Sequence, residues 1–518
     1  MRTLRAMRAL TLAALLFHAT LLLRPADAFL IRPFIEDAFY SLTVSAWIAD
    51  GKGMTIDGVN PTNGVQPLIC FLYVPCFLVV QGDRIAALVP IMALQSIIFA
   101  TAAFAIAWFT ATTCRQRDVR GTVFWLSAML IAWSIPLLNH MLNGLETGLA
   151  VAVAFGSTAL YNKMMERPES RASRWLGLGA LLGLAVLTRV DLAFLVVGVT
   201  GWHILRSGPN RKRRYAESAL VGIAAIVVSS PWWVYNVVTF GSLMPISGQA
   251  QIALNTDREL IVMTTIRYMA DAFVITTHLP HIVYEDYPWL GTVSLFVSVV
   301  LVLVTTRNLG ALRKGFQGWR ATWDPAAAVP VLAHALGLIL YYSLVFGSPH
   351  FTSRYLVPWR ILCSMAVVTL LYVVFMNASK PGRIGFALIV VAAMAVTING
   401  FMWNFTLPIG NLYVARSDWI NRNVAPNERV AMFQSGTAGF MCRNVVNLDG
   451  KVNADALRAT QRGTMADYII ENRFDVLMDW RELVLPLMED SRIRAAYQRV
   501  DSLSDGSLVF RRVRPVGK

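Results

Sequence analysis

The sequence predicts a polytopic α-helical membrane protein that ends in a small α/β domain. Of its 518 residues, 56% are hydrophobic and 15% are charged, a composition too apolar for an ordinary soluble protein. Apolar runs recur through residues 1–400, and several of them approach the ~20 residues that a helix needs to cross a bilayer. About eleven crossings fit this pattern. From residue 401 onward, charged residues become common and the apolar runs shrink to strand length.

Basic clusters between the apolar runs set the expected orientation. A net charge of +15 on a single face would indicate nucleic acid, but these clusters are short and alternate with crossings, so we expect no nucleic-acid partner. The positive-inside rule places them in the cytoplasm if Gln66–Val80 does not fully cross. The N-terminus is then inside, and residues 31–66 and the C-terminal domain are outside. Met1–Ala28 also fits a cleavable secretory signal, which would likewise place the segment that follows it outside. The clusters are Arg2/Arg5/Arg8, Arg115/Arg117/Arg120, Lys163/Arg167/Arg171/Arg174, Arg206/Arg211–Arg214, Arg307/Arg313/Lys314/Arg320 and Lys380/Arg383.

Two adjacent carboxylates, Glu36 and Asp37, follow the first crossing in the expected external loop. One interpretation is a helix N-terminus, where acidic side chains interact with the helix dipole. The other is a general base that takes the proton of a hydroxyl nucleophile. A phosphate leaving group needs no general acid, so one base and one cation on the phosphate would suffice for group transfer.

Polar side chains at the outer ends of later helices supply the candidate binding residues. Ionisable groups at that depth are costly unless they are paired or line a wet cavity. Arg354 is the candidate phosphate ligand because a guanidinium donates forked hydrogen bonds. For Arg189 and Asp191 a structural ion pair is the alternative to a place in the cavity. The remaining candidates for substrate binding are Tyr355, Glu146, Asn63, Gln66, Lys52, Gln249 and His350.

No residue pattern indicates a cofactor. His278, His281, Glu285 and Asp286 could be drawn as a metal site, but their spacing is not diagnostic. We therefore predict no metal site and no cofactor, and leave dependence on a divalent metal open. The cysteines lack metal-ligand spacing and are expected to be buried thiols; they are Cys70, Cys76, Cys114, Cys363 and Cys442.

The C-terminal domain, expected over residues 401–518, alternates short strands with helices, which predicts a small α/β unit. The expected strands are Arg429–Phe433, Asn444–Leu448, Phe474–Met478 and Ser507–Arg511, and the expected helices are Ser417–Asn423, Ala454–Arg462 and Glu482–Gln498.

The order of these segments resembles the GT-C superfamily of membrane glycosyltransferases, in particular its bacterial branch with arabinofuranosyltransferase-like and mannosyltransferase-like members. The resemblance covers nearly the whole chain. It rests on Glu36-Asp37-Ala38-Phe39 with Asp50-Gly51-Lys52-Gly53, Thr62–Leu68, Gly144–Thr147, Leu187–Asp191, Tyr235–Pro245 and Arg354–Pro358.

The resemblance implies an inverting glycosyltransferase of the bacterial inner membrane. Residues 1–400 would move a sugar from a polyprenyl-phosphate donor, a membrane lipid, to a glycan, glycolipid or protein acceptor at the outer face. Asp37 matches the catalytic base, and Glu36 stands where many relatives have a second Asp. The C-terminal domain would help to hold the acceptor. A transporter or flippase for lipid-linked saccharides is the alternative class, and transfer to protein or to lipid A is the alternative within the fold.

Overall fold

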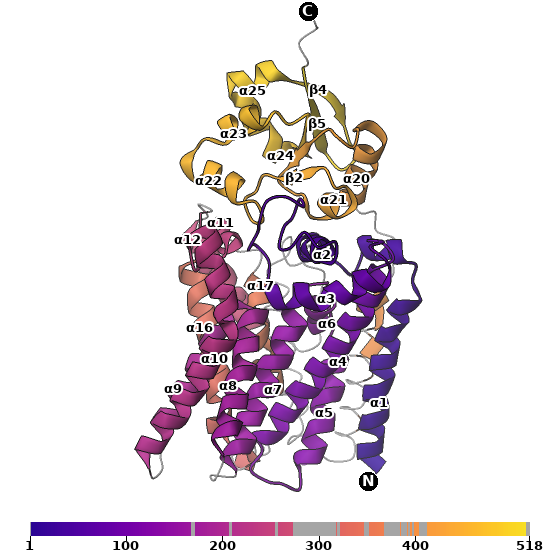
Figure 1. Cartoon of the computed structure of the whole chain (residues 1–518). Coiled ribbons are helices and arrows are strands. Elements are labelled where there is room, and N and C mark those ends of the chain that lie inside the picture. The colour runs from indigo at the N-terminus through magenta and orange to yellow at the C-terminus, as the bar shows by residue number, and fades with distance from the viewer. Residues whose placement is uncertain are drawn as a thin grey trace, which may run out of the picture.

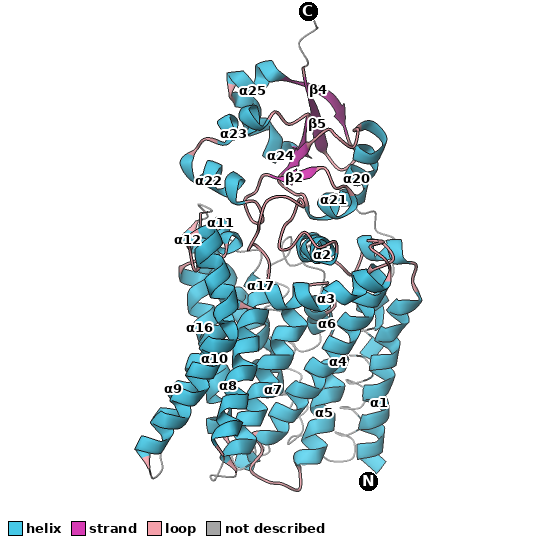
Figure 2. Cartoon of the chain, in the orientation of Figure 1, coloured by secondary structure: helices cyan, strands magenta, loops and turns pink. Residues whose placement is uncertain are grey.

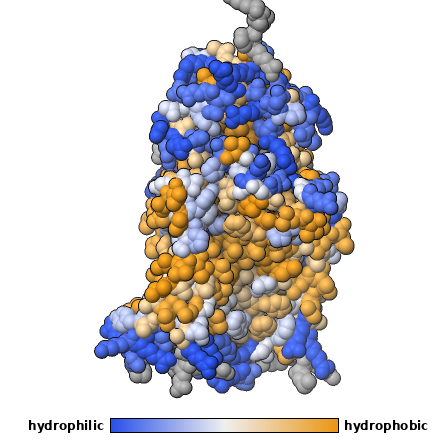
Figure 3. Space-filling model, in the orientation of Figure 1, coloured by the Kyte–Doolittle hydropathy of each residue, from blue (hydrophilic) through white to orange (hydrophobic). Residues whose placement is uncertain are grey.

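A bundle of helices forms the body of the molecule, and a sheet domain caps one end of it (Figures 1 and 2). The computed structural model describes residues 2–166, 171–206, 210–253, 257–272, 317–318, 322–346, 352–366, 384, 391, 394–395, 398–402 and 412–513. In the space-filling view of Figure 3, a broad apolar band crosses the visible face of the bundle between two hydrophilic ends. This is the surface of a protein that spans a membrane.

The helices of the bundle are joined partly by 3-10 turns. The helices are α1 (Arg2–Ala19), α2 (Glu36–Ala49), α3 (Pro67–Val79), α4 (Leu88–Thr112), α5 (Arg120–Ala132), α6 (Ile135–Met141), α7 (Thr147–Met165), α8 (Ala172–Thr188), α9 (Ala193–Leu205), α10 (Arg211–Phe240), α11 (Ile246–Ile252), α12 (Arg258–Asp271), α16 (Val329–Leu344) and α17 (Thr352–Tyr355). The turns are η1 (Thr20–Leu23), η2 (Ala26–Leu30), η3 (Val190–Leu192) and η4 (Pro325–Ala328).

Four stretches among the described residues are long and apolar enough to cross a membrane, and the bent pair α5–α6 can make a fifth. Helix α3 has 13 residues, about 20 Å at the usual rise, so it is too short to cross alone. Some of the apolar runs of residues 1–400, such as Val293–Val304, lie outside the described residues. The four stretches are Leu4–Leu23, Leu88–Thr112, Arg211–Phe240 and Pro325–Leu344.

Two local breaks position polar residues at the capped end of the bundle. Helix α8 ends at Thr188. The next residue, Arg189, has an extended backbone (φ −155°, ψ 129°), and the chain continues through η3 into α9. Helix α2 begins after the extended residue Ile35, so Glu36 and Asp37 occupy its first turn. The dipole interpretation of these two acids is therefore compatible with the structure, and it does not separate their roles.

The cap is a mixed five-stranded sheet of order β2-β1-β3-β5-β4. Strand β1 pairs in parallel with β2 and β3, whereas β5 pairs antiparallel with β3 and β4. The strands are β1 (Val430–Met432), β2 (Val445–Asn447), β3 (Val476–Trp480), β4 (Tyr497–Ser502) and β5 (Ser507–Arg512), and the helices are α20 (Leu412–Asn423), α21 (Gly436–Met441), α22 (Ala454–Arg462), α23 (Met465–Asn472), α24 (Arg481–Val484) and α25 (Ser491–Ala496).

The expected helix over Glu482–Gln498 is wrong. The chain forms the short helix α24, a 3-10 turn over Leu485–Glu489, helix α25, and then strand β4 from Tyr497. Pro486 lacks a backbone donor, so a continuous helix is broken there. Asp490 caps α25 by accepting a hydrogen bond from the amide of Arg492.

The cap packs directly on the bundle. Helix α21 lies against α2, and Phe440 of α21 is fully buried among the rings of Phe39 and Phe77. Arg84, in the loop before α4, donates hydrogen bonds to the carbonyl oxygens of Gly439 (3.2 Å) and Phe440 (2.7 Å). The apolar core of the bundle therefore continues into the cap.

Candidate active site

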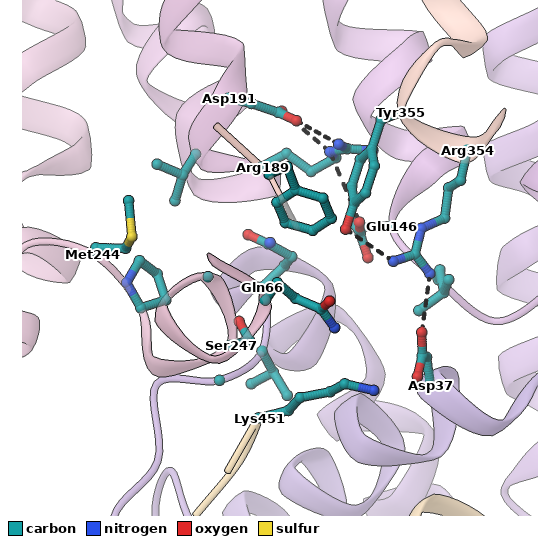
Figure 4. Close-up of a pocket in the computed structure, with 18 of the residues that line it drawn as sticks. Asp37, Gln66, Glu146, Arg189, Asp191, Met244, Ser247, Arg354, Tyr355 and Lys451 are labelled. Carbon is teal, nitrogen blue, oxygen red and sulfur yellow. Dashed lines mark hydrogen bonds and ion pairs between the residues drawn. The ribbon is translucent and has the colours of Figure 1, made fainter. Parts of the chain in front are cut away.

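A cavity of about 390 Å³ lies at the capped end of the bundle, where helix ends from the bundle meet one loop of the cap (Figure 4). One part of its wall is charged and the rest is largely apolar, an arrangement typical of a site for an amphipathic ligand. The charged lining residues are Asp37, Glu146, Arg189, Asp191, Arg354 and Lys451.

Asp37 and Arg354 meet in this cavity. Asp37 comes from the first turn of α2 and Arg354 from α17, yet Nη1 of Arg354 lies 3.4 Å from Oδ2 of Asp37. The side chain of Arg354 is only 14% exposed and that of Asp37 21%, so water screens the pair less than it would at a free surface. The carboxylate expected as base and the guanidinium expected as phosphate ligand thus lie side by side, 317 positions apart in sequence.

A second charged group stands beside them. Arg189 binds Asp191 through both Nε, at 3.2 Å, and Nη2, and its Nε lies 3.9 Å from Oε1 of Glu146. Tyr342 of α16 donates its hydroxyl proton to Asp191 at 2.8 Å. Since Arg189 is bound on two sides, the structural ion pair considered for Arg189 and Asp191 exists, and it also lines the cavity.

Tyr355 joins the two charged groups. Its ring stacks on Tyr342, with centroids 3.9 Å apart, and the guanidinium groups of Arg189 and Arg354 lie 4.7 Å and 5.1 Å from its centroid. Nη2 of Arg354 also donates to the Tyr355 hydroxyl at 3.2 Å. Cation–π contacts of this kind fix the planes of both guanidinium groups.

An apolar wall faces these charges. It is formed by α9, α16 and the segment that leads from α10 into α11. On the same three elements, side chains such as Val197, Leu340 and Leu243 are more than half exposed. The wall includes Leu145, Val190, Phe194, Met244, Pro245, Tyr341 and Phe346.

The structure does not bring every candidate residue to the cavity. Asn63 is fully buried; its amide nitrogen donates to Asn236 and its oxygen accepts from the amide of Ile246. It therefore ties the loop before α3 to α10 and α11. Lys52 lies in an exposed turn. Gln249 donates to the Met244 carbonyl and is not a lining residue.

The other candidate residues differ in where they lie. Glu36 turns away from Asp37 and binds the cap: its carboxylate accepts hydrogen bonds from the amides of Gly436 (2.5 Å) and Thr437 (3.0 Å). Gln66 does line the cavity. His350 and the four residues drawn as a possible metal site, which lie at positions 278–286, are outside the described residues.

Three lining residues were not predicted from the sequence: Lys451 of the cap, Tyr40 and Tyr342. Lys451 follows the Asn447–Gly450 segment, and its amine extends into the cavity toward Asp37 (Figure 4). No local signal in the sequence relates this lysine to a helix that begins at residue 36. Only the docking of α21 on α2 brings them together.

Metal coordination is not evident in the part of the chain that the structure describes, where no group of three or more His, Cys, Asp and Glu side chains is placed to hold an ion. The cysteines are all buried free thiols, as expected.

Comparison with sequence families assigns no activity. A family model described as a domain of unknown function (DUF8728) matches residues 409–514. No curated protein matches the sequence.

Solved structures with the same architecture give the fold. ArnT from Cupriavidus metallidurans, bound to undecaprenyl phosphate, superposes with a TM-score of 0.57 at 13% identity over 99% of this chain and 98% of its own. The oligosaccharyltransferase of Archaeoglobus fulgidus is also similar. Its complex with Zn and sulfate gives a TM-score of 0.51 at 12% identity, over 97% of this chain and 73% of that one. The same archaeal enzyme, AglB, bound to an inhibitory peptide and a dolichol phosphate gives 0.52 at 10% identity, over 99% and 75%.

Proposed function

We propose that this protein, which has the fold of the GT-C membrane glycosyltransferases, is an inverting glycosyltransferase. It moves a sugar from a polyprenyl phosphate to a hydroxyl of a glycan, glycolipid or protein at the outer face of the bacterial inner membrane. The observation that carries the proposal is the 3.4 Å contact between Asp37 and Arg354 inside one cavity. It unites a carboxylate base with a cation for the leaving phosphate.

The reaction needs one base and no general acid. The acceptor hydroxyl oxygen attacks the anomeric carbon, and its proton passes to Asp37 as the new C–O bond forms. The bond between the anomeric carbon and the phosphate oxygen breaks on the opposite face, and its electron pair leaves with the polyprenyl phosphate. In this scheme Arg354 donates forked hydrogen bonds to that phosphate.

The apolar wall supports a lipid-linked donor. A polyprenyl chain could lie along α9, α16 and the segment around Met244, with its phosphate beside Arg354 and its sugar against the group formed by Glu146, Arg189 and Asp191. The undecaprenyl phosphate and dolichol phosphate in the two similar structures are ligands of the same chemical class.

The charge distribution supports an outward-facing site. Basic residues flank the ends of α4, α5, α7 and α8 that are farthest from the cap (Figure 1); they are Arg115, Arg117, Arg120, Lys163, Arg171 and Arg174. Under the positive-inside rule that end is cytoplasmic. We accordingly propose a catalytic membrane domain over residues 1–400 with its N-terminus inside, and an external domain over residues 401–518 that borders the acceptor side.

A panel assay tests this function. The purified protein in liposomes is supplied with synthetic polyprenyl phosphates that carry different hexoses and pentoses, together with membrane extracts as acceptor source. Mass spectrometry then monitors release of polyprenyl phosphate, and NMR gives the anomeric configuration of the product. The proposal predicts release with inversion for one donor class. Movement of intact lipid-linked sugar across the liposome, without cleavage of its phosphate bond, would instead establish a flippase.

A further inference from the structure

We propose that the cap completes the donor site, with Lys451 as a second cation that binds the phosphate as it leaves; this inference rests on the proposed function. The amine of Lys451 reaches the cavity that holds Asp37 and Arg354, and Figure 4 shows it directed toward Asp37. The site is then divided between two domains, and the bundle alone lacks part of it.

The charge of Lys451 is secured by its neighbours. Nζ lies 3.4 Å from Oδ2 of Asp449, and the side chain is 19% exposed. Burial acts to lower the pKa of Lys451, but the carboxylates of Asp449 and Asp37 outweigh it and raise that pKa above its usual value. The amine is therefore a cation at neutral pH, and a ligand with negative charge can replace the attraction of Asp37.

The backbone of Lys451 is fixed against the bundle at the loop that closes the cavity. A Cβ added at Gly64 would lie 1.8 Å from the carbonyl oxygen of Lys451. Only a residue without a side chain allows this approach. The loop that contributes Gln66 to the cavity and the loop that contributes Lys451 thus pack backbone to backbone.

A second close contact fixes the whole cap. A Cβ added at Gly436 would lie 2.2 Å from the carbonyl oxygen of Glu36, and the Glu36 side chain accepts hydrogen bonds from the amides of Gly436 and Thr437. Tyr40, one turn further along α2, donates its hydroxyl proton to Asp449 at 3.5 Å. Helix α2 therefore presents Asp37 to the cavity and also holds the domain that carries Lys451.

Two cations suit the change in charge during transfer. The donor phosphate is a diester with one negative charge. When its bond to the sugar breaks, the product is a phosphate monoester, whose charge at pH 7 is roughly −1.5 to −2. Arg354 matches the charge already present in the donor, and Lys451 meets the charge that develops. An interaction that strengthens as the bond breaks accelerates the chemical step more than it improves donor binding.

The test compares binding of undecaprenyl phosphate with binding of undecaprenol, its uncharged counterpart, to the full-length protein in nanodiscs. Lys451→Ala should weaken undecaprenyl phosphate binding by about tenfold or more, as expected for loss of a charge-assisted hydrogen bond, and leave undecaprenol binding unchanged. Lys451→Arg should retain most of the affinity. With a donor from the panel assay, Lys451→Ala should lower kcat more than it raises the KM of the donor.

Gly436→Ala and Gly439→Ala provide a matched pair in the same helix. A Cβ at Gly439 meets nothing within 4 Å, so Gly439→Ala should bind undecaprenyl phosphate normally. Gly436→Ala forces α21 away from α2 and should reproduce the loss seen for Lys451→Ala, although the lysine is still present.

Unchanged phosphate affinity in Lys451→Ala, or an effect confined to the KM of the acceptor, overturns the inference. If Arg354→Ala loses affinity in that case, the proposed function survives without the role for Lys451. If the wild type itself does not distinguish undecaprenyl phosphate from undecaprenol, the proposed function fails as well.

Discussion

Removal of the Arg354 guanidinium tests the proposed phosphate site without knowledge of the sugar. The perturbation is Arg354→Ala, and the ligand is undecaprenyl phosphate. Two charge-assisted hydrogen bonds from a guanidinium to one phosphate contribute roughly 3–6 kcal/mol together. The empty protein already holds Arg354 against Asp37 at 3.4 Å, with both side chains less than a quarter exposed, and this contact must be loosened, at a cost of about 1–2 kcal/mol for a partly buried pair.

The difference leaves about 3 kcal/mol, which corresponds to a ~10²-fold rise in Kd. Arg354→Lys keeps the charge and loses the fork, so its Kd should rise only about tenfold. Binding can be followed by the shift in thermal unfolding that a ligand specific for the folded protein produces. Arg492→Ala is the matched control, because Arg492 is 56% exposed on the cap and pairs with Asp467 and Asp490.

The assignment of Arg354 as phosphate ligand requires three results together. Arg354→Ala should lose affinity for undecaprenyl phosphate, keep its affinity for undecaprenol, and unfold near the wild-type temperature when no ligand is present. A Kd of Arg354→Ala for undecaprenyl phosphate within about threefold of the wild-type value would refute the assignment of Arg354 as phosphate ligand. A change of about threefold is less than a single hydrogen bond to a charged group contributes.

Three other outcomes follow from the structure. Arg416→Ala should destabilise the cap by about 3–5 kcal/mol, since it leaves buried carboxylates without their cation; Arg416 is fully buried and binds Asp479 at 3.1 Å and Asp505 at 2.8 Å. Hydrogen exchange of β3 should quicken in this variant and stay normal in the exposed control Arg422→Ala. Burial raises the pKa of Glu36 from 4.5 to about 7, although its hydrogen bonds with Thr437 and Gly436 act to lower it. Between these two pH values the docked protein therefore binds a proton at Glu36 that the undocked protein does not. Docking should be strongest below pH 4.5 and weaken as the pH rises through 7. Protection of the α21 amides, corrected for intrinsic exchange, should fall over that range in the wild type and stay level in Glu36→Gln; equal pH profiles would contradict this origin. Finally, Val59 is 83% exposed and the native cysteines are buried, so Val59→Cys should react with an impermeant maleimide added outside intact cells. Reaction only after lysis would place the first loop in the cytoplasm.

The sequence predicted the fold class and several lining residues because both depend on features that are local in the chain. Apolar runs identify helices whatever their neighbours are. Charged residues such as Arg189 and Arg354 stand out because they interrupt such runs, and a buried charge needs a partner. The partners themselves, Asp191 for one and Asp37 for the other, required the three-dimensional arrangement.

The sequence could not separate the roles of Glu36 and Asp37. Successive residues of a helix point about 100° apart, so the two carboxylates face different surroundings once α2 is fixed between the cavity and the cap. Asp37 faces Arg354, and Glu36 faces the first amides of α21. Of the two adjacent acids, Asp37 therefore lies in the cavity and Glu36 lies in the interface between bundle and cap.

Lys451 lines the cavity but was not predicted to, whereas Asn63 was predicted to bind substrate but does not line the cavity. Lys451 is an unremarkable residue after a turn, and the docking of a separate domain places it in the cavity. Asn63 lies in a loop rich in amides, which suggested sugar binding, but its amide is used entirely within the protein by Asn236 and Ile246. Contacts between distant segments decide which polar groups remain for a ligand.

The most direct test of the account is single-turnover glycosyl transfer by Asp37→Asn, with the donor that the panel assay identifies. The substitution preserves the shape of the side chain but removes its negative charge, and with it both the ability to take a proton and the ion pair with Arg354. We predict that the rate of transfer falls by about 10²–10⁴, the usual contribution of a general base, while undecaprenyl phosphate still binds at least as tightly as it does to the wild type. Near-normal transfer by Asp37→Asn would contradict the role of Asp37 as base.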